Sequence, residues 1–457
     1  MTNPVLEQYT TGKPIVEGTF GHLTPEQTKL LQALWTRLLA SFDRSADELT
    51  SAPLPAQASG DGAAAKDAGR SSSAPASGRT SRQQRRLAAA PSPTPSGSSG
   101  WFNWGGSSAK LAESVEYRQL VEDAAAEESQ PPEFVVDQQQ QQQKQSVRTA
   151  FWNAVLCDHP DVLLLRFLRA RKWHVDDALD MLLKCLRWRI DEELDRVVWE
   201  GEGPLNLGLM RRGIGATHKT DRIGQPVLHI PVKLNDPKAQ PTEQMIDYTV
   251  YLMELARVVL YPPTEKVCLV FDTTDMSLSN MDWTFFRTYL HYLEHYYPEC
   301  LGLVLIYNAS WVFNGLWKLI RPLLDPVVAS KVHFVGSRDE IQNFIAPENL
   351  PKHLGGTDDF VYEYPMPRPG ENAAMRDVAA RMAATDRRLK ASQRLEDLTR
   401  EWAAAGASSN EAAQQREQAA SELVAASRAL DRYVRARTLY HRLGVINDDL
   451  TVNWQKS

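Results

Sequence analysis

Short apolar segments alternate with helix-patterned stretches between residues 226 and 335, and no other feature of the chain constrains its fold as strongly. The stretches 243–260 and 282–296 have the apolar spacing that is typical of helices. Alternating strands and helices predict an α/β fold with a largely parallel sheet that helices cover on at least one face. The segments with the length and β-branched composition of buried strands are PVLHIPV (226–232), VCLVFDT (267–273), LVLIYNA (303–309) and KVHFV (331–335).

Helical patterns precede this α/β region. Residues 147–200 contain two helix-like runs, and Asp176 between them has the residue type of an N-cap. A shorter helix is expected within residues 22–42, where Thr24 would be the N-cap and Pro25 the first helical residue. The chain therefore has a small helical lobe before its sheet.

The rest of the chain contains a segment of low-complexity composition and a C-terminal segment with a helical pattern. Residues 45–146 are rich in Ser, Ala, Pro, Gly and Gln, and such a segment cannot bury enough apolar surface to offset its conformational entropy. Residues 373–441 have helical spacing, with an interruption near 406–410, and predict one or two helices that either pack on the domain or bind a partner. The predicted divisions are an N-terminal segment with a short helix (1–44), a disordered low-complexity insertion (45–146), a helical N-terminal lobe (147–200), an α/β domain (201–370) and a C-terminal helical extension (371–457).

Charge, cysteine content and hydropathy narrow the function classes. A net charge of −6 gives no reason to expect nucleic-acid binding. The chain has no apolar leader and no run of about 18 apolar residues, which predicts a cytoplasmic protein without a spanning helix. The cysteines lack CxxC spacing and are expected to be free thiols in a reducing compartment; they are Cys157, Cys185, Cys268 and Cys300.

Sequence motifs give little support for an enzyme. A phosphate-binding G-x-x-x-x-G-K-[ST] loop, a G-x-G-x-x-G turn and a G-x-S-x-G elbow are all absent from the sequence. HYLEH (291–295) matches the H-x-x-E-H pattern of inverted zinc peptidases, in which two histidines one helical turn apart bind the metal. Five residues match easily by chance in a Tyr-rich helix, so surface or packing histidines are the preferred interpretation. No metal site or cofactor is predicted.

Residues 308–326, NASWVFNGLWKLIRPLLDP, have the periodicity of an amphipathic helix. Asn314, Lys318 and Arg321 lie opposite a broad apolar arc, and Pro322 is expected to break the helix near its end. Such an arc is typical of a core-facing helix, but Trp, Phe and Leu also suit a helix that lies in a bilayer interface. The arc comprises Phe313, Leu316, Trp317, Leu319, Ile320, Leu323 and Leu324.

Several motifs that occur in one order resemble the CRAL-TRIO lipid-binding family. The similarity runs from about residue 163 to 364, and it is strongest to non-classical fungal phosphatidylinositol transfer proteins of the yeast secretory type. It implies a mixed, mostly parallel sheet that floors a deep apolar cavity, gated by the amphipathic helix described above. The motifs are LLRFLRARKW, HKTDRIGQPV, VCLVFDT, YYPE (296–299), LIYNASWVF, RPLLDPVVASKV and ENLPKHLGG (348–356).

The resemblance also implies a site for the inositol phosphate. The family's basic pair matches Arg171 and Lys172, its acidic residue matches Glu299, and its lysine matches Lys331. Fixed cations suit an anionic headgroup because charge-assisted hydrogen bonds to phosphate are strong. Val328 stands where the family has a threonine and cannot donate a hydrogen bond, so the headgroup site would lack that donor.

The choline-lipid site of the classical members is largely lost. The positions that match its four hydroxyl side chains are Thr217, Leu228, Val267 and Leu269. Apolar side chains cannot replace hydrogen bonds to a buried phosphate, so phosphatidylcholine should be a poor ligand. The apolar lining would favour a second apolar or sterol-like lipid.

These observations predict a non-enzymatic carrier that extracts phosphatidylinositol from a membrane, shields it and delivers or presents it. The protein would be cytoplasmic, with transient peripheral membrane association, and the resemblance implies a connection to phosphoinositide kinase pathways. Two alternatives remain open at this point. One is a lipid-gated adaptor without transfer activity, and the less favoured one is a zinc metallopeptidase that acts through HYLEH.

Overall fold

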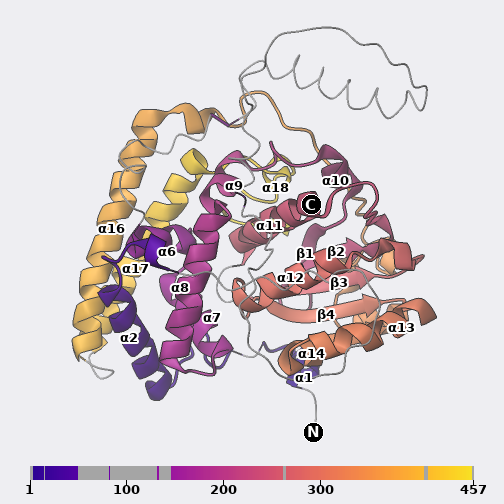
Figure 1. The fold of residues 1–457 in the computed structure, drawn as a ribbon, viewed down its shortest axis with the longest axis horizontal. Helices are drawn as coiled ribbons and strands as arrows, with labels where there is room; N and C mark the ends of the chain where they lie inside the picture. Colours follow the sequence, from indigo (N-terminus) through magenta and orange to yellow (C-terminus); the bar gives the residue numbers. More distant parts are fainter. Residues whose placement is uncertain are drawn as a thin grey trace, which may run out of the picture.

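The computed structural model has a sheet with flanking helices beside a helical part that includes the C-terminal helices (Figure 1). The described residues are 4–14, 16–49, 82, 131–132, 146–260, 264–405 and 410–454.

The sheet has five strands in the order β1-β2-β3-β4-β5. β1 is antiparallel to β2, and each later strand is parallel to its neighbour, which confirms the mixed, mostly parallel sheet. All four predicted strands are present. β1 was missed because its sequence, ATHKT, contains no apolar run. The strands are β1 Ala216–Thr220, β2 Pro226–Pro231, β3 Val267–Asp272, β4 Leu301–Tyr307 and β5 Val332–Val335.

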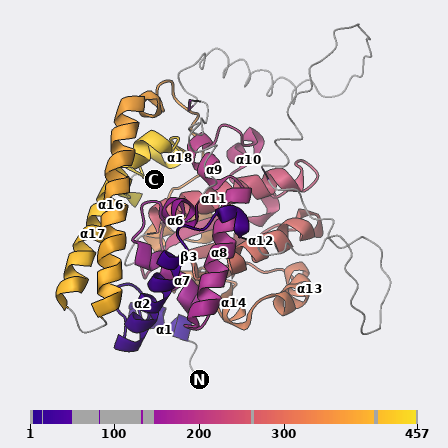
Figure 2. The same cartoon turned by 60° about the vertical axis from the view of Figure 1, so that its left-hand side comes forward.

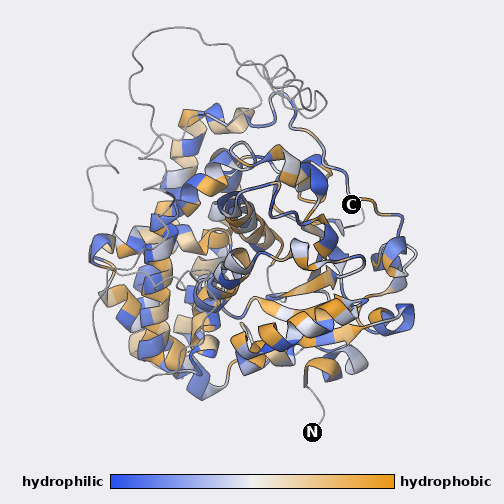
Figure 3. Ribbon diagram, turned by 45° about the vertical axis from the view of Figure 1, so that its right-hand side comes forward, coloured by the Kyte–Doolittle hydropathy of each residue, from blue (hydrophilic) through white to orange (hydrophobic). Residues whose placement is uncertain are grey.

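Alternate side chains along the strands belong to two different apolar clusters, one on each face of the sheet. Cys268, Val270 and Leu303 point to one face and pack with Phe344 and Ile345. The opposite face packs against α13 through side chains that include Leu269, Val304 and Ile306. Both faces are buried, which explains why the strands are coloured largely hydrophobic in Figure 3.

Helices connect the strands and cover the sheet. The stretches expected at 243–260 and 282–296 form α11 Thr242–Val259 and α12 Trp283–His295, which confirms both predictions. The other helices of this part are α9 Leu194–Glu200, α10 Leu207–Arg212, α13 Trp311–Ile320, α14 Pro326–Ser330 and α15 Arg338–Gln342.

The helical lobe is built from α2 Pro25–Ala40, α6 Val147–Val155, α7 Pro160–Ala170 and α8 Val175–Asp191. Thr24 is the N-cap of α2, as predicted, and it forms a capping box with Gln27. The expected N-cap at Asp176 is wrong, because α8 begins two residues earlier than this cap implies, at Val175, and His174 takes the cap position. Asp176 lies in the first turn instead and pairs with Arg37 of α2. An unpredicted helix, α1 Pro4–Thr11, packs against the sheet part through Tyr9 and Phe344.

The C-terminal extension packs on the helical lobe. It contains two long helices, α16 Val378–Ala405 and α17 Asn410–Val434, which confirms the predicted helices; the break expected near 406–410 falls mostly outside the described residues. Leu395, Trp402 and Leu423 of these helices share one core cluster with α2 and α8. In Figure 2, α16 and α17 run side by side along α2. Of the two fates considered for these helices, packing on the domain is the one observed.

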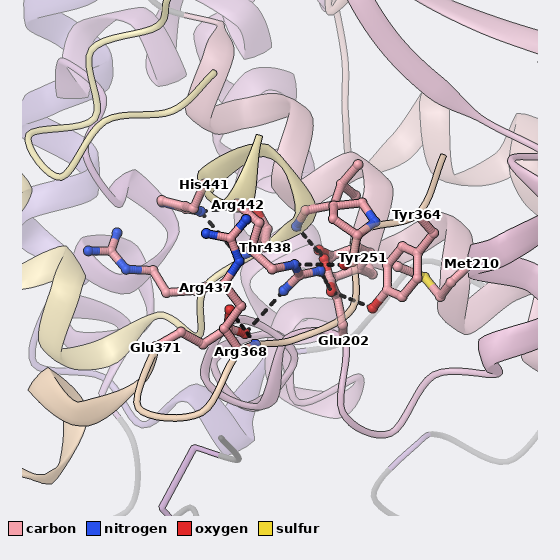
Figure 4. Close-up of polar contacts among 12 residues, drawn as sticks. Glu202, Met210, Tyr251, Tyr364, Arg368, Glu371, Arg437, Thr438, His441 and Arg442 are labelled. Atoms are coloured by element: carbon pink, nitrogen blue, oxygen red, sulfur yellow. Dashed lines mark hydrogen bonds and ion pairs between the residues drawn. The ribbon is translucent and has the colours of Figure 1, made fainter. Parts of the chain in front are cut away.

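The chain's last short helix, α18 Leu439–Arg442, is held by Glu202 (Figure 4). The Glu202 carboxylate accepts hydrogen bonds from the Tyr251 hydroxyl at 2.8 Å, the Tyr364 hydroxyl at 2.7 Å and the Leu439 amide at 2.7 Å. It also pairs with Arg442. This buried network joins the end of the chain to α11 and to the segment after the sheet.

The predicted insertion, residues 45–146, lies almost entirely outside the described residues. Its ends meet, because Ser45 forms a β-bridge with Ser146. The described chain continues past the predicted boundary to Leu49, whose side chain is buried. Described residues of the insertion contact the fold: Asp47 pairs with Arg187 at 3.3 Å, Arg82 pairs with Asp247 at 2.7 Å, and the Pro132 carbonyl accepts from Trp199 at 2.7 Å.

Candidate functional site

Charged side chains gather at the end of the sheet where β3, β4 and β5 begin. Lys266 directly precedes β3, Glu299 lies two residues before β4, and Lys331 directly precedes β5. Because parallel strands start at the same edge of a sheet, the three side chains come from neighbouring positions there. We call Lys266, Glu299 and Lys331 the edge cluster.

Lys331 is the most enclosed member of the edge cluster. The short helix α14, capped by Asp325, delivers it to the start of β5. The residue is 8% exposed, and its Nζ donates to the Leu301 carbonyl at 2.8 Å. The carbonyl is a neutral partner, so this hydrogen bond does not compensate the positive charge of Lys331.

Lys266 lies within electrostatic reach of both Glu299 and Lys331. Burial lowers the pKa of Lys266, Lys331 acts in the same direction, and Glu299 opposes them. Glu299 is half-buried and has a backbone φ of 58°, a left-handed conformation that places it at the turn before β4. Two of the four predicted headgroup residues, Glu299 and Lys331, are therefore brought together.

The predicted basic pair, Arg171 and Lys172, lies at the end of α7. Arg171 is the half-buried C-cap, and Lys172 is exposed. The last turn of α7 reaches the edge cluster, because Arg169 pairs with Glu265 at 2.8 Å, next to Lys266. Neither Arg171 nor Lys172 bonds through its side chain to another described residue. Their convergence with Lys331 stays a prediction.

Lys266 was missed by sequence analysis. The motifs that carried the family resemblance gave this position no role, and the strand register that brings it to Glu299 and Lys331 is not visible in sequence. The available signal was a lysine directly before the buried segment VCLVFD.

The four positions matched to the choline-lipid site lie together on the sheet. Thr217 pairs in register with Leu228, and Leu228 with Leu269, so they form a line across β1, β2 and β3. Leu228, Val267 and Leu269 belong to the apolar cluster beneath α13. The amide of Thr217 donates to the Tyr440 hydroxyl at 2.6 Å, so the C-terminal segment lies against this end of the line.

The helix α13 lies on this sheet face, but only part of the apolar arc of the predicted gate is buried against the sheet. Phe313, Leu316 and Ile320 are buried against the sheet, whereas Leu319 and Leu323 are exposed. The arc is wider than the stripe that a sheet can cover, which leaves its flank in solvent. Trp317 packs on Phe334, and Leu324 is partly buried in the cluster.

Two further details bear on the sequence predictions. α13 ends at Ile320, and a 3₁₀ turn that contains Pro322 follows. This break was expected because proline has no backbone N–H to donate. Val328 on α14 packs into the apolar cluster beneath α13. No helix among the described residues is long and apolar enough to cross a membrane.

HYLEH lies near the end of α12, and its two histidines stack on each other, with ring centroids 4.2 Å apart. Burial, with a contribution from His295, lowers the pKa of His291 to about 4, so this ring is neutral at pH 7. Within the described ranges, no group of three His, Cys, Asp or Glu side chains is arranged to hold a metal ion. The geometry favours packing histidines.

Comparisons with known proteins match the sheet part and the helical lobe. Residues 210–356 match the CRAL/TRIO domain, and residues 119–184 match the CRAL/TRIO N-terminal domain. A CRAL-TRIO domain-containing protein of Schizosaccharomyces pombe is 38% identical over 307 residues, covering 66% of this chain and 69% of that protein. The phosphatidylinositol transfer protein CSR1 of Eremothecium gossypii is 29% identical over 313 residues, covering 66% and 72%. The Sec14 cytosolic factor of S. pombe is 29% identical over 213 residues, covering 43% and 74%.

Proposed function

Because the chain belongs to the CRAL-TRIO family, we propose that it binds phosphatidylinositol and carries it between membranes. The observation that carries the proposal is a juxtaposition: the apolar sheet face beneath α13 ends at the edge cluster, where Lys266 and Lys331 supply positive charge. A ligand that fits both features has apolar chains and an anionic head. Glu299 would accept a hydrogen bond from an inositol hydroxyl.

The acyl chains are the part of the ligand that most needs shielding. Two chains with about thirty methylenes would cost on the order of 25 kcal/mol to expose to water, at ~0.8 kcal/mol each. The sheet face could cover them only if α13 moved, because Phe313, Leu316 and Ile320 now occupy that face. We therefore assign α13 the role of a gate that is closed in this structure.

The outer side of the gate has the composition of a membrane-contacting surface. Trp311 is 84% exposed and Leu319 is 62% exposed, with the cations Lys318 and Arg321 beside them. Tryptophan, leucine and basic residues on one helix suit the interface of an anionic bilayer. A cytoplasmic protein that meets membranes transiently through α13 fits this surface.

Replacing Leu319 by serine is expected to weaken binding to phosphatidylinositol-containing vesicles about three- to tenfold, because the partial burial of one leucine contributes ~1 kcal/mol. Sedimentation with vesicles measures the effect. Met382→Ser on α16 is the matched control, since Met382 is 67% exposed but lies on the C-terminal extension. Equal binding by both variants would contradict the role of α13.

Lipids that co-purify with the protein test the ligand directly. Mass spectrometry is expected to find phosphatidylinositol enriched over phosphatidylcholine, because Leu228, Val267 and Leu269 offer no hydroxyl to a choline lipid. A sterol-like or other apolar lipid is the expected second ligand. Phosphatidylcholine in excess over phosphatidylinositol would overturn the argument from the apolar character of this sheet face.

A specific observation favours the adaptor as a second candidate. Val378, Met382 and Leu389 are exposed on α16, and their spacing puts them on one face of that helix. Such a stripe could contact an apolar helix of a partner, including one from a phosphoinositide kinase pathway. Lipid-dependent binding of a partner that Met382→Ser abolishes, in a protein without transfer activity, would support the adaptor over the carrier.

A further inference from the structure

Lys266 and Lys331 approach the start of β4 from its two sides. β4 lies between β3 and β5, and Val267, the residue after Lys266, pairs in register with Leu301. The Val267 amide donates to the Cys300 carbonyl at 2.8 Å, which fixes the position of Lys266 beside β4. The carbonyl of Leu301 is the one that accepts from Lys331 Nζ, at 2.8 Å. The bonds of Val267 and Lys331 thus hold the two lysines beside adjacent residues, Cys300 and Leu301, at the start of β4.

The neighbours of Lys266 are committed to other partners. Glu265, the adjacent carboxylate, pairs with Arg169 at 2.8 Å and lies 5% exposed. Lys331 is bonded to the Leu301 carbonyl. Among the described residues, none forms a hydrogen bond or ion pair with the Lys266 ammonium. Glu299 supplies one negative charge near the two lysines, so the edge cluster keeps a net positive charge that an anionic ligand would compensate.

The position of this cation indicates what kind of anion it would bind. Val267 and Leu301, which follow the edge cluster, are already part of the apolar cluster beneath α13. An anion held between Lys266 and Lys331 would therefore have an apolar surface directly beside it. A phosphate diester with attached acyl chains fits this arrangement better than a free phosphate.

We propose that Lys266 is a headgroup-binding residue that contacts the lipid phosphate together with Lys331. This inference rests on the proposed function and adds to it a residue that the family resemblance did not supply. Lys331 holds one side of the phosphate and Lys266 the other, while Glu299 accepts from the inositol ring. Ammonium groups on two sides would orient the phosphate and select anionic over zwitterionic lipid.

Lys266→Met tests the proposal, because methionine keeps the length and apolar stem of the side chain and removes its charge. Binding of phosphatidylinositol from vesicles is expected to weaken about five- to tenfold, while an apolar fluorescent probe binds as in the wild type. Lys266→Arg should retain most of the affinity. Lys238→Met, at an exposed lysine in the loop after β2, should change nothing.

Soluble inositol 1-phosphate, assayed beside the vesicles, separates a lipid headgroup site from a site for free phosphate esters. The proposal expects much weaker binding of the soluble compound than of the lipid. Wild-type phosphatidylinositol affinity in Lys266→Met would overturn the inference and leave the proposed function standing. Absence of phosphatidylinositol binding by the wild-type protein would overturn both, and equal affinity for the soluble compound would overturn the lipid assignment.

Discussion

Lys331→Ala is expected to weaken phosphatidylinositol binding about ten- to hundredfold. A charge-assisted hydrogen bond to phosphate contributes roughly 1.5–3 kcal/mol, and the enclosed position of Lys331 limits the water that could replace it. Titration with phosphatidylinositol vesicles measures the loss, and Arg171→Ala tests the basic pair in the same assay. An apolar probe should bind both variants normally.

The Lys331 experiment needs a control for folding, because the variant leaves the Leu301 carbonyl without its bond. Thermal unfolding of each variant provides it. If Lys331→Ala and Arg171→Ala both keep wild-type phosphatidylinositol affinity, the proposed headgroup site is wrong even though the fold is right.

Arg416→Ala is expected to lower the free energy of unfolding by about 3–5 kcal/mol, because it leaves a buried carboxylate without its partner. Arg416 on α17 forms a bidentate pair with Asp161 of α7, at 2.6 and 2.7 Å. The Asp161 carboxylate also accepts from Trp35 at 2.6 Å. This contact ties the C-terminal extension to the helical lobe, so the variant should unfold at lower denaturant concentration.

Arg394→Ala is the matched control, since Arg394 of α16 pairs with Glu422 of α17 at 2.8 Å, but in solvent. Its cost should be about 0–1 kcal/mol. Equal stability of the two variants would show that the Arg416–Asp161 pair does not tie the C-terminal extension to the helical lobe.

The Arg416 effect should depend on pH. Burial acts to raise the pKa of Asp161, but the charge and hydrogen bonds of Arg416 outweigh it and hold the pKa at about 2, below the ordinary 3.8. The pair therefore stabilises the fold fully above pH 3.8, and this contribution is lost as the pH falls toward 2. Unfolding measured at pH 7 and pH 3 should show a smaller difference between wild type and Arg416→Ala at pH 3.

The strands that sequence analysis found are those whose apolar runs are continuous. Both faces of β3 and β4 are buried, so their sequences carry a strong signal. β1 carries none, because its residues include a histidine, a lysine and two threonines and it is held by pairing with β2. The position of β1 therefore depends on its pairing with β2, which its own sequence does not indicate.

The candidate site was predictable only where a motif marked it. Glu299 and Lys331 stood in motifs, and the structure brings them to one edge of the sheet. Lys266 reaches the same edge through strand register, which no local pattern encodes. The division of the α13 arc into buried Phe313 and exposed Leu319 was equally hidden, because periodicity shows which residues share a face but not how much of that face the sheet covers.

Transfer of labelled phosphatidylinositol between vesicles tests the central claim most directly. The account predicts that the full-length protein moves phosphatidylinositol rapidly, moves phosphatidylcholine hardly at all, and loses phosphatidylinositol transfer in Lys331→Ala. Equal transfer of the two lipids, or no transfer by the wild-type protein, would contradict it.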